Sequence, residues 1–117
     1  MLKFYHYAKC QTCVKAKKYL AGKKFTLQEI DITTSPPSVN ELKTLIRQSG
    51  RPVTDFLNRS GVQYREKNMK EQVKKLSEDA IIVMLSQDGR LIKRPLVTDG
   101  KKSTVGFQEE EFSKQWR

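Results

Sequence analysis

The opening of the chain alternates between apolar stretches with strand character and one segment with helical spacing. Residues 2 to 7 (Leu-Lys-Phe-Tyr-His-Tyr) are rich in aromatic side chains and predict a strand. From about residue 11 to residue 21 the apolar positions recur at helical spacing, and Gly22 stands where a helix C-cap belongs. A second strand is indicated by the apolar residues that follow, Phe25, Leu27, Ile30 and Ile32. The first third of the chain is therefore expected to be a β-α-β unit.

The middle of the chain carries helical patterns only. Ser38 followed by Glu41 is typical of a capping box, and Gly50 ends the helix that this box begins. The apolar stripe of that helix is Leu42, Leu45 and Ile46. A short helix is expected around residues 53–57, another around residues 69–76, and a further one from a cap at residues 77–79 through Leu85. These patterns predict an all-helical insertion over about residues 38–87.

The last thirty residues predict a hairpin and a helix. Asp88-Gly89 indicates a turn, and Leu91 to Arg94 leads into a strand over residues 95–98. Asp99-Gly100 is a two-residue hairpin signal, with residues 103–107 as the returning strand. Residues 109–116 predict a short helix that carries Phe112 and Trp116 on one face.

Together these elements predict an α/β fold. Two parallel strands and an antiparallel hairpin make a four-stranded mixed sheet, and the order of elements is that of a thioredoxin-like fold with an all-helical insertion. With 117 residues, the chain is expected to be a single domain over residues 1–117.

Composition and charge narrow the class of protein. Charged residues make up 31% and hydrophobic residues 37%, which is typical of a soluble globular domain. There is no apolar run of membrane-spanning length and no signal-peptide pattern, so we expect a cytoplasmic protein that does not associate with membranes. We also expect a monomer. The net charge is +10, from 23 basic and 13 acidic side chains. Because no recognition motif accompanies this charge, we expect no direct nucleic-acid binding.

The chain has two cysteines, Cys10 and Cys13, spaced as Cys-Gln-Thr-Cys. A permanent structural disulfide is not expected in a reducing cytoplasm, and a four-residue loop offers little chain-entropy stabilisation. The pair is therefore read either as reactive thiols or as half of a metal site. A structural zinc site needs four ligands, whereas Cys10, Cys13 and the single His6 supply three at most, and His6 falls within a predicted strand. We expect no metal.

The position of Cys10 favours a reactive thiolate. Cys10 lies just before the predicted helix, so its sulfur can face unpaired backbone N–H groups and the positive end of the helix dipole. Lys9 is adjacent, and the first 28 residues hold seven lysines and no acid. Cys13, about one turn further, would lie nearer the packed side. We therefore assign Cys10 as the attacking nucleophile and Cys13 as the resolving thiol, with Lys9 and Thr12 beside them as substrate-binding residues.

A second motif, Lys93-Arg94-Pro95, has two interpretations. It can be the exposed start of a strand, or Arg94 can bring a guanidinium fork to an anion at the cysteines. The local pattern does not choose between them. We include Arg94 as a catalytic and substrate-binding candidate and Pro95 as a substrate-binding candidate.

Taken in order, several short motifs resemble the arsenate reductase (ArsC) and Spx family over nearly the whole chain. They are Tyr7-Ala8-Lys9-Cys10 with Cys13, Pro36-Pro37 before Glu41-Leu42, Phe56-Leu57-Asn58, Tyr64-Arg65-Glu66, Leu91-Ile92-Lys93-Arg94-Pro95-Leu96 and Val105-Gly106-Phe107. The resemblance implies a thioredoxin fold with a helical insertion and a cis peptide bond before Pro95. The small members with Cys-x-x-Cys and Asn at position 58 are the ones that this chain resembles best.

The two branches of the family imply different functions. Glutaredoxin-linked arsenate reductases match this chain at Cys10 and Arg94. The two further arginines with which they hold an oxyanion would fall near Asn58, with Arg59 one residue off, and near Phe107, where no basic side chain stands. The Spx branch carries Cys-x-x-Cys as an oxidation sensor and binds the C-terminal domain of the RNA polymerase α-subunit. Arg47 matches a basic residue of that contact surface.

These observations favour a thiol–disulfide oxidoreductase with no bound cofactor, restored by glutathione, glutaredoxin or thioredoxin. The alternative is an Spx-like redox-sensing regulator that binds the RNA polymerase α-subunit. A further alternative is a true arsenate reductase linked to glutathione and glutaredoxin or to thioredoxin, although the missing arginines predict weak or absent arsenate reduction.

Overall fold

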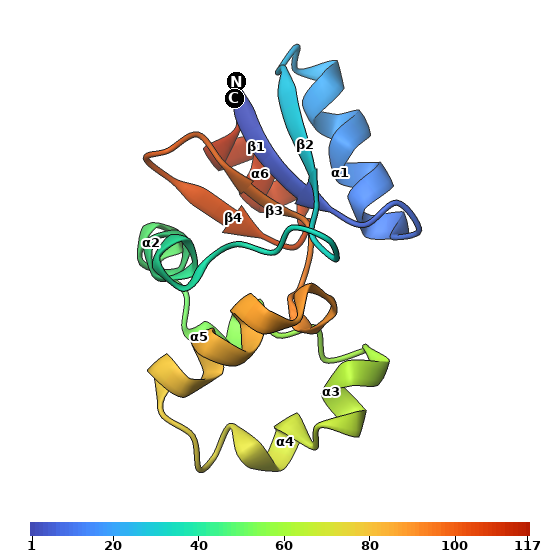
Figure 1. Cartoon of the computed structure of the whole chain (residues 1–117). Helices are drawn as coiled ribbons and strands as arrows, with labels where there is room; N and C mark the ends of the chain where they lie inside the picture. Colours follow the sequence, from blue (N-terminus) through green and yellow to red (C-terminus); the bar gives the residue numbers. More distant parts are fainter.

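Four strands form one mixed sheet in the computed structural model, which describes all residues from Met1 to Arg117. The strands lie in the order β2-β1-β3-β4, with β1 parallel to β2 and antiparallel to β3, and β3 antiparallel to β4 (Figure 1). The strands are β1 (Leu2–His6), β2 (Leu27–Asp31), β3 (Leu96–Thr98) and β4 (Ser103–Val105). The helices are α1 (Gln11–Gly22), α2 (Val39–Ser49), α3 (Val62–Glu66), α4 (Met69–Gln72), α5 (Glu78–Gln87) and α6 (Glu109–Gln115), with 3₁₀ helices η1 (Val53–Phe56) and η2 (Gly89–Leu91).

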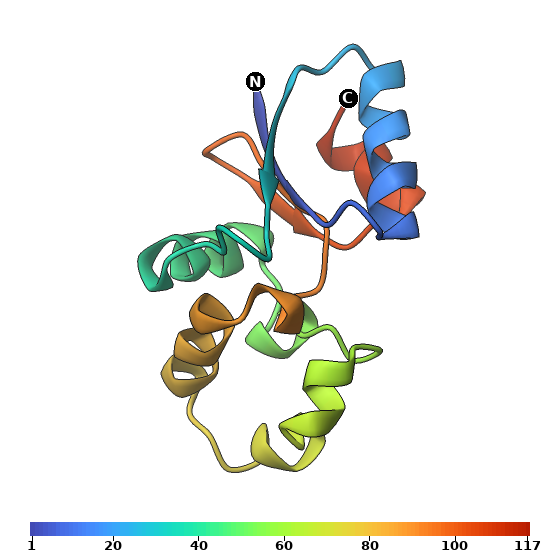
Figure 2. The same ribbon diagram turned by 45° about the vertical axis from the view of Figure 1, so that its right-hand side comes forward.

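Helices cover both faces of the sheet, because the strands bury alternate residues on opposite sides. Phe4 of β1 and Val97 of β3 pack with α1 and α6, whereas Tyr5 of β1 and Leu96 of β3 pack with α2 and α5. Figure 2 shows α1 and α6 together on one side of the sheet and α2 on the other. The predicted α/β, thioredoxin-like fold with a four-stranded mixed sheet is therefore confirmed.

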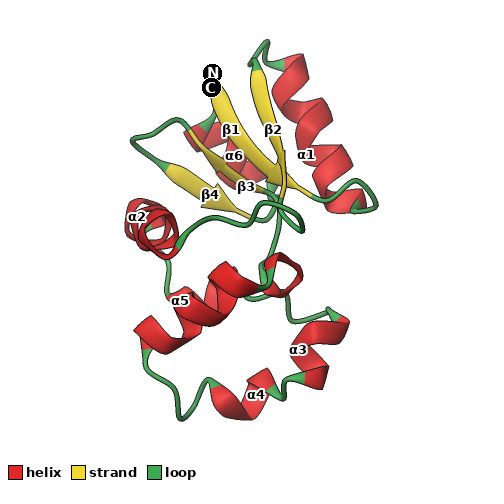
Figure 3. Ribbon diagram, in the orientation of Figure 1, coloured by secondary structure: helices red, strands yellow, loops and turns green.

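Every regular element between β2 and β3 is helical (Figure 3). α2 packs on the sheet, and α3, α4 and α5 lie beyond the end of the sheet at which β1 finishes (Figure 1). Fully buried side chains such as Phe56, Met69 and Leu85 fill the space between these helices and the sheet. The helical segments thus stand next to the end of the sheet from which the chain leaves β1 and enters the cysteine motif.

Two helix ends differ from the sequence prediction. Gly22 is the last residue of α1 and not its cap; the left-handed conformation is at Lys24, with φ +67°. This conformation costs a residue with a side chain about 1 kcal/mol, and the next residue, Phe25, packs against the α1–α6 cluster. At α2, Ser38 accepts the N–H of Glu41 as predicted, but the Glu41 carboxylate bonds to Tyr5 and Lys3 and does not close a capping box.

The β3–β4 hairpin also differs from its prediction. Its loop has four residues, 99–102, and not two, because Thr98 pairs with Ser103 across the ladder. One oxygen of the Asp99 carboxylate accepts the N–H groups of both Lys101 and Lys102, at 2.8 and 2.9 Å. The Asp side chain therefore organises a wider turn than the Asp-Gly pair alone indicates.

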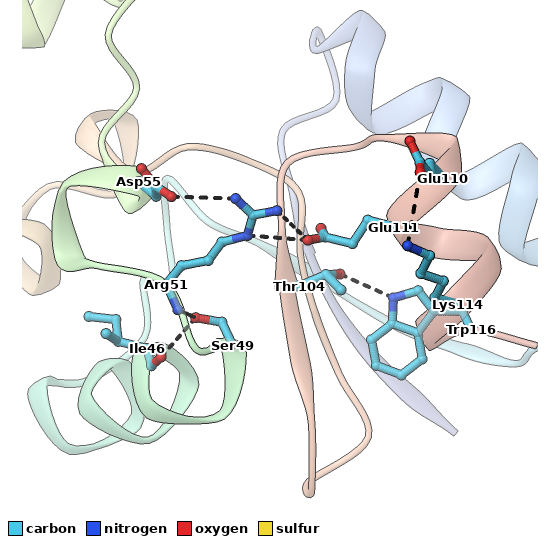
Figure 4. A network of polar contacts seen from close by, with 9 residues as sticks. All are labelled: Ile46, Ser49, Arg51, Asp55, Thr104, Glu110, Glu111, Lys114 and Trp116. Atoms are coloured by element: carbon cyan, nitrogen blue, oxygen red, sulfur yellow. Dashed lines mark hydrogen bonds and ion pairs between the residues drawn. The ribbon is translucent and has the colours of Figure 1, made fainter.

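Polar contacts hold the last helix against the rest of the molecule (Figure 4). The Arg51 guanidinium, just after α2, donates through Nε and Nη2 to Glu111 of α6 and through Nη1 to Asp55 of η1 at 3.4 Å. The Trp116 indole N–H donates to the Thr104 hydroxyl of β4 at 3.1 Å, and both side chains are buried. No helix has the length and apolar character that crossing a membrane requires.

Candidate active site

Cys10 is the N-cap residue of α1. Its backbone is extended, with φ −90° and ψ 113°, and its sulfur accepts the backbone N–H of Cys13 at 3.3 Å. Its own N–H donates to the carbonyl of Tyr7 at 3.0 Å, which fixes the turn between β1 and α1. The side chain is half-buried, and the first turn of α1 contains no acid. Its sulfur therefore occupies the place where a helix N-terminus stabilises negative charge.

Cys13 lies one turn further and is 2% exposed. Burial and, after it, the hydrogen bond with Cys10 raise the pKa of Cys13 to about 12. The Tyr7 backbone and the positive charge of Arg94 act in the opposite direction and lower the pKa of Cys13. The two thiols are thus unlike each other: one lies at a helix N-cap and in contact with solvent, and the other is buried and protonated at neutral pH.

Arg94 lies in the neighbourhood of the cysteine pair, and a cis peptide bond joins it to Pro95. Its guanidinium carbon stands 5.0 Å from the centre of the Tyr7 ring, and its Nη1 donates to the carbonyl of Arg90 at 3.4 Å. Its Nε is buried and has no hydrogen-bond partner. The cis bond that the resemblance implied is present, and the side chain is held by an aromatic ring.

A cleft of about 530 Å³ opens beside Arg94. Its lining combines two arginines, several neutral polar side chains and no acid: Tyr7, Asn58, Ser60, Gly61, Val62, Gln63, Arg90 and Arg94. Backbone pairing explains why residues so distant in sequence meet here, because Asn58 donates its N–H to the carbonyl of Leu91 at 2.9 Å. The cleft, whose lining includes Arg94 but neither cysteine, is suited to an anionic or polar group.

The other candidate residues take different positions. Lys9 and Thr12 are exposed beside Cys10, and neither side chain forms a hydrogen bond or an ion pair. Pro95 is buried, and its carbonyl accepts the N–H of Gly106 at 2.9 Å. The structure thus brings Cys10, Cys13 and Arg94 into one neighbourhood. Lys9 and Thr12 remain at its solvent edge and Pro95 beneath it.

Two residues of the site were not singled out from the sequence. Tyr7 holds Arg94 with its ring and Cys10 with its carbonyl, and Arg90 lines the cleft while its carbonyl accepts from Arg94. An aromatic residue three positions before a cysteine motif is a usable signal for Tyr7. Arg90 lies four residues before Arg94, but only the turn of η2 makes the two converge.

Uncharged side chains with other contacts stand at the two positions where the arsenate reductases have their further arginines. Phe107 packs its ring against Phe112 and Tyr19, at centroid distances of 4.8 and 5.9 Å, as part of an aromatic cluster. Asn58 presents its amide toward the Arg90 carbonyl at 3.5 Å. Arg59, one residue further, reaches the carbonyl of Thr54 at 3.4 Å. Arg94 is therefore the one side chain at the three matching positions that carries a charge.

The zinc interpretation finds no support in the positions of the side chains. No group of three or more His, Cys, Asp and Glu residues comes together in the molecule. His6 stacks on Phe4 at 5.5 Å and places its Nε2 3.7 Å from a carboxylate oxygen of Glu29. It therefore does not complete a ligand set with the cysteines.

Comparisons with known proteins find relatives along nearly the whole chain. An Uncharacterized protein YusI from Bacillus subtilis (strain 168) is 50% identical over 115 residues, which is 98% of each chain. The Global transcriptional regulator Spx 2 of Bacillus anthracis is 25% identical over 97% of this chain and 86% of its own length.

Solved structures match the whole fold as well. An ArsC family related protein from Bacteroides fragilis superimposes with a TM-score of 0.93 at 39% identity, covering 97% of this chain and 95% of its own. An arsenate reductase from Vibrio cholerae superimposes with a TM-score of 0.84 at 27% identity, over 97% of this chain and 95% of its own. The model of the ArsC family matches residues 5–115. This chain belongs to the ArsC family.

Proposed function

We propose that this protein is a thiol–disulfide oxidoreductase in which Cys10 attacks and Cys13 resolves. The observation that carries the proposal is the asymmetry of the two thiols. Cys10 is a half-buried N-cap whose sulfur accepts a backbone N–H at 3.3 Å, whereas Cys13 is 2% exposed, with a pKa raised by burial to about 12. An anion at the first position and a protonated thiol at the second are what a two-step exchange requires.

In the first step the Cys10 thiolate attacks one sulfur of a substrate disulfide. A bond forms between Cys10 and that sulfur, the substrate S–S bond breaks, and the other substrate sulfur leaves as a thiolate that takes up a proton. The N–H of Cys13 and the positive end of α1 stabilise the anion before attack. Arg94, held on Tyr7, adds a positive charge on the cleft side.

In the second step Cys13 loses its proton and attacks the Cys10 sulfur of the mixed disulfide. The substrate leaves as a thiol, and Cys10 and Cys13 are oxidised to a disulfide, so that two electrons pass to the substrate. The negative charge at Cys10, which raises the pKa of Cys13, disappears once Cys10 is in the mixed disulfide. Formation of the intermediate therefore makes the resolving thiol easier to ionise.

A thiol reductant restores the dithiol and completes the cycle. Glutathione, glutaredoxin or thioredoxin each supplies the two electrons that the oxidised pair needs. The chemistry requires no metal and no organic cofactor, because both sulfurs belong to the chain.

An assay panel tests this proposal. The reduced protein is given a glutathione mixed disulfide or a protein disulfide, with glutathione or thioredoxin as the electron donor. Turnover that is lost in Cys10→Ser supports the proposal. A wild-type protein that reduces none of these disulfides, or a Cys10→Ser variant that keeps full turnover, contradicts it.

A redox-sensing regulator is the second candidate. It is favoured by the Cys-x-x-Cys pair, by the similarity to Spx 2 of Bacillus anthracis, and by Arg47, which is exposed on α2. In that role oxidation of the cysteines would change binding to the α-subunit of RNA polymerase, without turnover. Mixing the protein, reduced and oxidised, with the isolated C-terminal domain of that polymerase component tests it: a complex in one state favours the regulator, and no complex in either state excludes it.

Arsenate reduction is the third candidate and is expected to be weak. Arg94 would hold the oxyanion without the two further guanidinium groups of the arsenate reductases, because Asn58 is neutral and Phe107 is apolar. Robust arsenate turnover with glutathione and glutaredoxin would show that this expectation is wrong.

A further inference from the structure

We infer that one face of α1 is the docking surface for an acidic protein partner in the thiol exchange. We call it the α1 basic face and define it as Gln11, Val14, Lys15 and Lys18. The inference rests on the proposed function, because the partner is the polypeptide whose disulfide Cys10 attacks. It adds a class of substrate: disulfides that are carried by, or lie beside, an acidic surface.

Helix geometry places this face beside Cys10. Its four positions follow the spacing i, i+3, i+4 and i+7, so they form one stripe about 10 Å long from the first turn of the helix. The opposite stripe, Cys13, Ala16 and Leu20, is buried against the sheet. The stripe therefore begins at the residue after Cys10 and faces solvent.

The charge of this face is not neutralised within the chain. Lys15 and Lys18 are exposed and form no ion pair. The one carboxylate that bonds to α1 is that of Glu29, which lies 2.8 Å from Lys17, a residue outside the α1 basic face. Lys9 continues the positive charge past Cys10, and Arg90 and Arg94 continue it into the cleft. A partner with carboxylates meets one sign of charge along this whole approach.

One apolar side chain lies among the charged residues of the α1 basic face. Val14 is 42% exposed, one of four large hydrophobic residues that the fold leaves open, and its N–H donates to the carbonyl of Cys10 at 3.1 Å. A small apolar centre with a charged rim is typical of a protein–protein contact and contributes nothing to phosphate binding. We therefore assign the face to a protein rather than to a nucleic acid.

Electrostatic attraction of this kind acts mainly on the rate of encounter. It accelerates association of opposite charges by about 10-fold or more at low salt, and the gain falls as salt screens the surface. The effect is thus separable from the chemistry of Cys10, since a neutral disulfide reacts with the same thiol and gains nothing.

Two cyclic peptides with the same internal disulfide, one with a tail of Glu residues and the other with a tail of Lys residues, provide the test. The rate constant for their reduction by the reduced full-length protein is measured at low and at moderate salt. The variant is Lys15→Glu/Lys18→Glu. The matched control is Lys70→Glu/Lys75→Glu, which makes the same change of net charge at exposed positions in and just after α4, distant from α1 (Figure 1).

We expect the acidic peptide to be reduced about 10-fold faster than the basic peptide at low salt, falling to about 2-fold at moderate salt. Lys15→Glu/Lys18→Glu should abolish this preference, and Lys70→Glu/Lys75→Glu should retain most of it. Equal rates for the two peptides, or equal losses in the two double variants, would overturn the docking inference while leaving the thiol chemistry intact.

Failure to reduce either peptide would overturn the proposed function, and the docking inference with it. A DNA duplex in the same buffer provides the remaining outcome. If the wild type binds the duplex and Lys15→Glu/Lys18→Glu does not, while the two peptides react at equal rates, the face belongs to nucleic acid and the inference is overturned.

Discussion

Removal of the buried thiol by Cys13→Ala should make the free energy of unfolding less sensitive to alkaline pH. Burial raises the pKa of Cys13 to about 12, whereas a cysteine in the unfolded chain titrates near pH 8.5. Above that pH the unfolded state loses the thiol proton and the native state keeps it. The stability that Cys13 contributes is therefore fully present below about pH 8.5 and is lost as the pH rises toward the native pKa.

The size of this effect follows from the difference between the two pKa values. Each pH unit between the two pKa values lowers the free energy of unfolding by about 1.4 kcal/mol. Through Cys13 alone, the wild type should therefore lose roughly 2–3 kcal/mol of stability between about pH 8.5 and pH 10.5. The pKa of Tyr5 is also raised, by burial and then by its hydrogen bond to Glu41, but Tyr5 is present in both proteins and cancels in their difference. Loss of the sulfur itself should cost Cys13→Ala about 1–2 kcal/mol at every pH.

Urea denaturation of the reduced proteins across this pH range measures the difference. Cys10→Ala is the matched control: it keeps the buried thiol, and burial is the largest cause of the raised pKa, so most of the alkaline loss should remain. Parallel stability curves for the wild type and Cys13→Ala would refute the account of Cys13 as a buried, protonated thiol.

Three further predictions concern side chains around the site and the core. Arg94→Ala should slow alkylation of Cys10 at neutral pH by about 3- to 10-fold, and Arg94→Lys should slow it by less. Tyr7→Leu should act like Arg94→Ala and Tyr7→Phe should not, because the ring supports the guanidinium. Equal alkylation rates in all four variants would show that the contact between Arg94 and the Tyr7 ring has no role at the site. A double-mutant cycle of Arg51→Met and Glu111→Gln should give a coupling energy of about 1 kcal/mol in urea denaturation, and a value of zero would mean that the ion pair does not hold α6. Trp116→Phe should cost about 1–3 kcal/mol beyond its lost volume, because the Thr104 hydroxyl is left buried without its partner; Thr104→Val in the same background should then restore part of the stability.

The elements of the fold were predictable because their signals are local. Period and turn residues located both ends of the β-α-β unit and of α2, and Ser38 and Ser77 cap the helices that they were expected to cap. One error arose where a distant partner decides the geometry. Glu41 satisfies the capping-box pattern, but Tyr5 and Lys3 of β1 recruit its carboxylate across the sheet. The sequence around residue 41 does not reveal these distant partners.

The place of Cys10 at a helix N-cap was predictable from the sequence, whereas the contacts that hold Arg94 were not. The Cys-x-x-Cys pair at a strand-to-helix turn can be recognised in the sequence, because an N-cap position by itself places the sulfur beside unpaired backbone N–H groups. The place of Arg94 depends on the ring of Tyr7 and the carbonyl of Arg90, which converge only after the helical segments bring Asn58 beside Leu91. Contacts of that kind follow from tertiary packing, so the sequence left the two interpretations of Arg94 open.

Trapping the exchange intermediate tests the division of labour between the cysteines most directly. Reduced wild-type protein, Cys10→Ser and Cys13→Ser are treated with glutathione disulfide, and the products are read by intact-mass spectrometry. The account predicts a mixed disulfide that accumulates at Cys10 in Cys13→Ser, little adduct in Cys10→Ser, and an internal Cys10–Cys13 disulfide in the wild type. Equal adducts in the two variants, or a wild type that stops at the mixed disulfide, would contradict it.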